Sequence, residues 1–201
     1  MTMKHVLLGA FAGVLLASAA LAQQAPGPDA APAPTGRPEV KAVGDWFVRC
    51  FPVQSPSPCD MFEELDSPNT RQRVLSLSIA FVPSLDRHAL QITVPLEISI
   101  PKGLTITTDG YKSPVLRYRR CDRNGCYVEM AVDNGMIESL AKSGPKGQIT
   151  IAADNGKVYP ITFSLKGFAG AHDDMVSQAR AKAKAVSKPD EAAGAAAPAK
   201  P

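Results

Sequence analysis

Hydrophobic and polar residues alternate along much of this chain with the period of two that is typical of β-strands. In the clearest case, residues 74–81, Leu75, Leu77, Ile79 and Phe81 alternate with serine and alanine. The same pattern predicts further strands at residues 45–51, 61–65, 89–94, 96–100, 104–108, 115–120, 126–132, 149–151 and 159–165. Turn residues separate these segments at fairly regular spacing, which predicts an all-β, mainly antiparallel β-sandwich or barrel-like fold.

Two segments carry helical signals. Asp133 or Asn134 can cap one short helix, which ends before Gly144-Pro145. A C-terminal helix is predicted from residue 172 to about residue 186, where alanine is frequent but the apolar stripe is thin.

The inward-facing strand positions define the predicted core. The residues expected there are Trp46, Leu77, Ile79, Ile98, Ile106, Ile151, Ile161 and Phe163. Trp46, the single tryptophan, follows Gly44-Asp45. We interpret it as a core anchor, with ligand stacking as the alternative.

The first 22 residues have the features of a secretory signal peptide. Lys4 precedes an apolar run at residues 6–16, and Ala20-Leu21-Ala22 forms a cleavage pattern before Gln23. The run is shorter than the roughly 20 apolar residues that span a bilayer. We therefore expect export through the inner membrane and no transmembrane segment in the mature chain.

Composition divides the rest of the chain. Residues 23–38 are a Pro/Ala-rich linker, residues 39–172 form the β-sandwich domain, and residues 173–201 form a helix and a disordered Ala/Lys/Pro tail. The domain has 15 basic and 14 acidic residues. A nucleic-acid partner is therefore not expected, because such proteins concentrate basic charge on one element.

The four cysteines of an exported chain predict disulfides. Short, turn-compatible spacing favours Cys50 with Cys59 and Cys121 with Cys126. Zinc ligation and redox catalysis are the competing interpretations, but neither spacing matches the usual arms of a zinc site or a C-x-x-C motif.

The second pair depends on the turn between its cysteines. A four-residue loop over residues 122–125 places Cys121 opposite Cys126, with Gly125 in a left-handed position. A two-residue turn at Asn124-Gly125 would instead pair Arg123 with Cys126. Disulfide geometry favours the four-residue loop.

No catalytic constellation is recognisable. The chain has no metalloprotease, nucleophile-elbow or phosphate-binding motif, and His88 and His172 lie far apart in sequence. The acidic run at residues 63–66 lacks the spacing of a calcium loop and is interpreted as a solvated edge. We expect no enzymatic activity, no cofactor and no metal.

The densest basic run is the candidate binding surface. It comprises Arg117, Arg119 and Arg120, with Lys112 and Arg123 at its margin. One interpretation is a charged sheet edge that resists aggregation. The other is a guanidinium patch for carboxylate, phosphate or sulfate groups of a protein or an anionic glycan.

The order of several segments resembles the invasion-associated locus B family of exported bacterial proteins. The matching segments are Gly44-Asp45-Trp46 leading to Cys50, Cys59, residues 94–103, the strand from Tyr118 to Cys121 with Cys126 behind it, and residues 163–168. The resemblance implies an all-β, disulfide-containing periplasmic or surface-delivered protein, associated in pathogenic members with entry into host cells. It implies no catalytic residues.

Two functional hypotheses follow. The first is an exported, non-enzymatic envelope protein associated with host-cell invasion or surface interaction, with a partner in the bacterial envelope or on the host surface. The alternative is a periplasmic chaperone or envelope stress factor. The expected location is the periplasm, with outer-membrane association or secretion as further possibilities.

We predict that the mature protein begins at Gln23, because Ala20 and Ala22 supply the small residues that signal peptidase requires. Intact-mass measurement of the exported protein tests this, allowing for cyclisation of Gln23. A mass that still includes residues 1–22 would contradict the prediction.

Overall fold

A computed structural model describes residues 36–186 of the chain. The predicted signal peptide, most of the linker and the tail after residue 186 lie outside the described residues. The strands are β1 (Glu39–Val43), β2 (Trp46–Cys50), β3 (Cys59–Asp66), β4 (Arg73–Val82), β5 (Arg87–Val94), β6 (Leu104–Thr107), β7 (Arg120–Asp122), β8 (Gly125–Val132), β9 (Lys146–Ala152) and β10 (Val158–Ser164). The helices are the 3₁₀ turn η1 (Ile100–Lys102), α1 (Asn134–Lys142) and α2 (Phe168–Val186).

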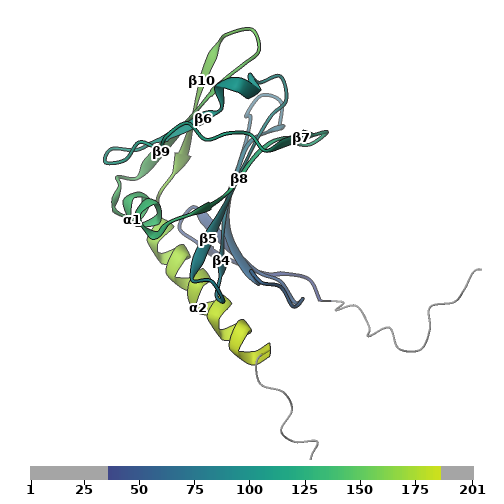
Figure 1. The fold of residues 1–201 in the computed structure, drawn as a ribbon, viewed down its shortest axis with the longest axis vertical. Helices are drawn as coiled ribbons and strands as arrows, with labels where there is room; N and C mark the ends of the chain where they lie inside the picture. Colours follow the sequence, from purple (N-terminus) through teal and green to yellow (C-terminus); the bar gives the residue numbers. More distant parts are fainter. Residues whose placement is uncertain (1–35, 187–201) are drawn as a thin grey trace, which may run out of the picture. The chain divides into compact units, whose positions relative to one another are not determined.

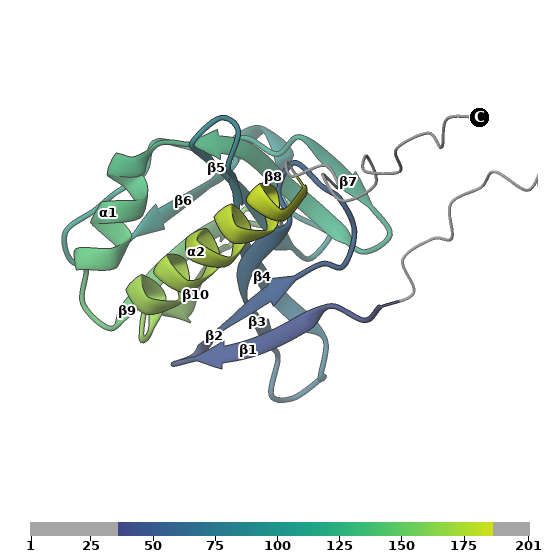
Figure 2. The same cartoon turned by 90° about the horizontal axis from the view of Figure 1, so that it is seen from below.

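The strands form two separate antiparallel sheets (Figure 1). The larger has the order β1-β2-β3-β4-β5-β8-β7, and the smaller has the order β10-β9-β6. Helix α2 lies against β2, β3 and β4, and α1 contacts α2 (Figure 2). The fold is therefore the sandwich-like form of the predicted all-β class, with the two predicted helices.

Alternation along the strands creates the core. In β4 and β5 every second side chain is buried, and these side chains face α2 and the smaller sheet. Trp46 is fully buried, which confirms its interpretation as a core anchor. The other predicted core residues are also buried, except Ile161, which is only partly buried.

Two predicted strands are wrong. Residues 96–100 contain only an isolated bridge at Ile98, because Glu97 has a positive φ of 66° that interrupts an extended strand. Leu96 and Ile100 are exposed. Residues 115–119 are irregular apart from a bridge at Leu116, and regular pairing resumes only in β7.

Other boundaries differ from the sequence pattern. Strand β1 is not among the predicted strands, and all of its residues are at least partly exposed. Helix α2 begins at Phe168, so the expected domain boundary at residue 172 falls within it. The cap of α1 is Asp133, whose Oδ1 accepts the Met136 amide proton over an N–O distance of 2.8 Å.

Both disulfides have the pairing that the spacing predicts, Cys50 with Cys59 and Cys121 with Cys126. The turn of the second pair differs from the prediction. Asp122 pairs with Gly125, so the loop has two residues, Arg123 and Asn124, rather than four. The cysteines remain directly opposite each other, and Gly125 has a positive φ of 142°.

One contact joins the start of the large sheet to the end of the small one. We name it the Trp46 junction, formed by residues 44–46 and 163–168. Gly44 and Gly167 both have positive φ, and a Cβ on either would overlap the backbone of the other's segment. The Asp45 amide donates to the Lys166 carbonyl at 3.1 Å.

The side chains of the Trp46 junction reinforce this contact. Trp46 donates its indole N–H to the Ser164 carbonyl at 2.9 Å. Its ring meets the ring of Phe168, the first residue of α2, edge to face at a centroid distance of 5.1 Å. Ser164 Oγ donates to an Asp45 carboxylate oxygen at 2.6 Å. The junction therefore ties β2, β10 and α2 together.

Glu63 of β3 lies buried beside the Trp46 junction, so the interpretation of residues 63–66 as a solvated edge is wrong for this residue. Its two carboxylate oxygens accept the Ser164 amide proton at 3.0 and 3.1 Å. Burial raises the pKa of Glu63 to about 7, a rise that the Ser164 hydrogen bond opposes and the nearby Asp45 charge reinforces. The folded protein therefore holds a proton on Glu63 at pH values where the unfolded chain has released it.

We predict that the contribution of Glu63 to the free energy of unfolding falls as pH rises from about pH 5 to about pH 8, because this carboxyl group binds fewer protons in the unfolded state than in the folded state in this range. The Glu63→Gln variant keeps the acceptor for Ser164 but cannot ionise, and so loses this dependence. Over this pH range, the free energy of unfolding of the wild type should fall by about 1–3 kcal/mol more than that of Glu63→Gln.

Urea denaturation of both proteins across this range tests the prediction, with the exposed Glu39→Gln as the matched control. Parallel profiles for the wild type and Glu63→Gln would show that Glu63 titrates as it does in the unfolded chain.

Candidate functional site

The structure distributes the predicted arginine patch over separate environments. Arg117 donates to the Pro101 carbonyl at 2.8 Å, beside η1. Arg120 lies on β7, and Arg123 lies in the β7–β8 turn. Lys112 forms an isolated bridge with Thr107 of β6. Arg117, Arg119 and Arg120 therefore do not share one strand, although the predicted strand at residues 115–120 contained all three.

Acidic neighbours compensate two of these arginines. The Arg120 guanidinium lies 2.7 Å from Asp122 and 3.0 Å from Glu129. It also covers the Tyr127 ring, at 3.7 Å from the ring centroid. Arg119 lies 3.9 Å from Glu129. This arrangement lowers the net positive charge that the run offers to an anion. The binding role of these residues remains a prediction.

Between these arginines the chain turns inward. Tyr118 packs against the core instead of alternating outward on a strand. Burial raises the pKa of Tyr118 to about 12.

The strand register defines a second surface, which the sequence did not indicate. One face of the large sheet packs against α2 and the smaller sheet. The opposite face, which we name the outer face, carries a lateral row of directly paired residues on five strands. The row consists of Phe47, Phe62, Ser78, Gln91 and Glu129. Neighbours in such a row lie within about 5 Å at their Cβ atoms.

An arginine–carboxylate pair organises one end of the outer face. Arg49 donates two hydrogen bonds to Asp60, at 3.0 and 2.6 Å, and Ser78 donates a third at 3.1 Å. The Arg49 guanidinium also lies 4.5 Å from the centroid of the Phe62 ring. The hydrogen bond to Asp60 raises the pKa of Arg49. These contacts hold both charged groups in fixed positions.

A shallow hollow of about 420 Å³ lies between this pair and Tyr127. Its floor includes Ser76, Gln91 and Thr93, which project from β4 and β5. Within residues 36–186, the side chains of Gln91 and Thr93 make no hydrogen bond to protein. They are therefore available to a ligand on a rigid strand scaffold.

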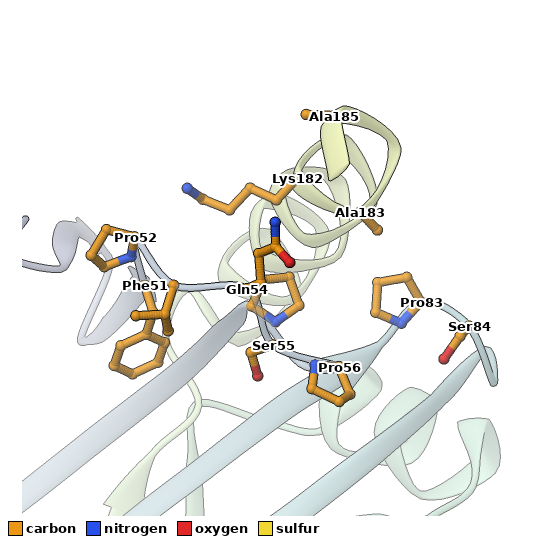
Figure 3. A pocket seen from close by; sticks show the side chains of 12 residues that line it. Phe51, Pro52, Gln54, Ser55, Pro56, Pro83, Ser84, Lys182, Ala183 and Ala185 are labelled. Atoms are coloured by element: carbon orange, nitrogen blue, oxygen red, sulfur yellow. The ribbon is translucent and has the colours of Figure 1, made fainter. Parts of the chain in front are cut away.

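A different groove, of about 550 Å³, lies where the Cys50–Cys59 loop approaches the end of α2. Figure 3 shows Gln54 and Pro56 of the loop opposite the helix, with Pro83 from the β4–β5 turn alongside. Lys182 extends from α2 over the groove (Figure 3). The disulfide lies under the same helix, with Cys50 Sγ 3.2 Å from Gln178 Oε1. The lining is mainly proline, alanine and other apolar carbon, with few groups that could fix a ligand's orientation.

The structure brings together two histidines that are distant in sequence. The Nε2 atoms of His88 on β5 and His172 on α2 lie 3.0 Å apart, and His172 Nδ1 lies 3.1 Å from Asp173. Burial lowers the pKa of His88, as does the proximity of His172. A neutral pair can share one hydrogen bond here, so the contact joins α2 to the large sheet.

Sequence reasoning missed the outer face because its organisation depends on strand register. Phe62, Ser78 and Gln91 are more than ten residues apart along the chain, and only pairing of β3, β4 and β5 makes them neighbours. The alternation of β4 did show that small residues share one face. That signal could have indicated an uncovered surface, but it could not show which residues of β3 and β5 lie beside the small residues of β4.

Comparison with known proteins identifies the family. The model of the family described as Invasion associated locus B (IalB) protein matches residues 46–176. The chain belongs to this family of invasion-associated proteins, which confirms the resemblance seen in the sequence. The matched segment includes the Trp46 junction from Trp46 onward and both disulfides.

Relatives with related names support the assignment. An invasion protein B homologue of Brucella abortus (strain 2308) is 30% identical over 131 residues, which cover 64% of this chain and 74% of the relative. A homologue from Brucella abortus biovar 1 (strain 9-941) gives the same values. The crystal structure of invasion associated protein B from Bartonella henselae shares the fold, with a TM-score of 0.61 and 19% identity over 70% of this chain and 97% of that chain.

In the part of the chain that the structure describes, no helix has both the length and the apolar character needed to cross a membrane.

Proposed function

We propose that this protein is an exported, non-enzymatic member of the invasion-associated locus B family that binds a protein or glycan of the bacterial envelope or host surface. The outer face of the large sheet is the proposed binding surface. The proposal combines the signal-peptide pattern, the two disulfides and the family membership.

The observation that carries the proposal is the organised hollow of the outer face. Arg49 and Asp60 are fixed by their mutual hydrogen bonds and by Ser78, so they present a rigid border. Gln91 and Thr93 supply unused donors and acceptors between that border and Tyr127. Such preorganisation lowers the entropy cost of binding.

Charge balance selects the type of partner. The hollow is lined by Arg49 and Arg73 and by Asp60 and Glu64, so its formal charges cancel. Recognition then depends on hydrogen bonding rather than on net charge, and binding is insensitive to salt. A polyanionic glycan bound by arginines would show the opposite behaviour.

The experiment measures binding of the labelled mature protein to host cells and to envelope vesicles. The test variant is Gln91→Ala with Thr93→Ala, which removes polar groups that hold no other part of the described protein. We expect about tenfold weaker binding, because two hydrogen bonds are lost. Lys157→Ala, in the exposed β9–β10 turn, is the control and should bind like the wild type.

Three results would contradict the proposal. If the double variant binds as tightly as the wild type, the outer face takes no part in binding. Suppression of aggregation of several unrelated unfolded proteins, with no saturable surface binding, would favour the chaperone or stress-factor alternative. Loss of binding at high salt would indicate instead that Arg117, Arg119 and Arg120 bind an anionic partner.

A further inference from the structure

A second groove opens between the β3–β4 turn, the connection from β5 to η1, and the β9–β10 hairpin. Its volume is about 740 Å³, within the range of ligand sites. None of its lining residues lines the hollow of the outer face around Arg49 and Asp60. The groove is therefore a separate surface, and its argument does not rest on the proposed function.

Apolar side chains line this groove without being covered. Leu96 is 47% exposed and Tyr159 is 45% exposed. Ile161 is only partly buried, although alternation along β10 places it on the same side as the fully buried Phe163. Ile161, the predicted core residue that is not fully buried, therefore lies in the same groove as two exposed apolar residues. Local exceptions of this kind are typical of functional surfaces.

The rim of the groove is acidic. Asp66, Glu97 and Asp154 line it, and no lysine or arginine among the described residues does so. None of the three carboxylates takes part in an ion pair within residues 36–186. The domain as a whole has nearly equal numbers of acidic and basic residues, so this concentration is local. An apolar floor with an acidic rim complements a ligand that is both apolar and cationic.

Backbone hydrogen bonds fix one wall of the groove. Glu97 has a positive φ of 66°, an unfavourable conformation for a residue with a side chain. Its carbonyl accepts the Asp154 amide proton at 3.1 Å, and the Ser99 amide donates to the Ala152 carbonyl at 2.7 Å. These contacts hold Glu97 between the exposed Leu96 and the buried Ile98.

We propose that this groove binds an extended peptide segment of a protein partner, in which apolar side chains are flanked by lysine or arginine. The apolar side chains contact Leu96, Tyr159 and Ile161, and the cationic groups reach the carboxylates at the rim. Fatty acids and other anionic lipids are disfavoured because their head groups would meet these carboxylates.

The test uses synthetic peptides of equal length and the full mature protein. One peptide carries lysine around leucine and valine, a second replaces lysine with glutamate, and a third replaces leucine and valine with serine. Binding is measured by calorimetry, and its location by amide chemical shifts in NMR. We expect the first peptide to bind at least about tenfold more tightly than the others, with shifts at the groove residues.

Two variants separate the charge from the apolar contact. Asp66→Asn with Asp154→Asn should weaken binding of the first peptide and make it less sensitive to salt. Leu96→Ser with Tyr159→Ser should weaken it without changing the salt dependence. Val53→Ser, an exposed apolar residue of the other groove, is the matched control and should leave binding unchanged. Unchanged urea midpoints establish that each variant is folded.

Several outcomes would overturn the proposal. These are equal binding of all three peptides, absence of binding by the first peptide, and shifts confined to residues outside the groove. Preferential binding of oleate would assign the groove to a lipid. Dimerisation that increases with protein concentration, and that is absent in the variant Leu96→Ser with Tyr159→Ser, would assign the groove to a second copy of the chain. Failure here leaves the outer-face proposal intact, because that test uses different residues and a different readout.

Discussion

The close contact of Gly44 with Gly167 is the constraint on which the arrangement of sheets and helix depends. Neither position can accept a Cβ, because it would overlap the backbone of the opposite segment. This approach brings the Asp45 amide to the Lys166 carbonyl. It also places Trp46 against Ser164 and Phe168, so that the start of β2, the end of β10 and the start of α2 meet at one point.

The Trp46 junction has consequences for both proposed binding surfaces. Because β10 is held at its Ser164 end, α2 begins beside β2 and covers one face of the large sheet. The opposite face, which α2 does not cover, carries the organised hollow around Arg49 and Asp60. At the other end of β10, Tyr159 and Ile161 lie outside the covered core and line the acidic groove. One fixed contact thus accounts for a covered core and two uncovered surfaces.

The sequence predicted what depends on local periodicity. Alternation in β4 located a strand and its buried face, and Asp133 located the start of α1. The cysteine spacing led to the observed pairs, although the turn between Cys121 and Cys126 is shorter than expected. The strand predicted at residues 96–100 was wrong because the positive φ of Glu97 leaves no trace in the hydrophobic pattern.

The candidate sites could not be predicted in the same way, because they depend on distant segments. His88 and His172 meet only through the packing of α2 on the large sheet. Arg120 meets Glu129 only through the β7–β8 pairing, so its charge compensation was not visible in the basic run. Ile161 follows the core pattern, but the pattern cannot tell whether another element covers it.

The most direct test of this account compares the free energies of unfolding of Gly167→Ala and Gly156→Ala. Both glycines have positive φ, 81° and 83°, so alanine carries a similar conformational cost of about 1–2 kcal/mol at each. A Cβ at Gly156 meets nothing within 4 Å, whereas one at Gly167 overlaps the Val43 carbonyl. We expect Gly167→Ala to lose at least about 2 kcal/mol more than Gly156→Ala in urea denaturation. Equal losses would contradict the central role of the Trp46 junction.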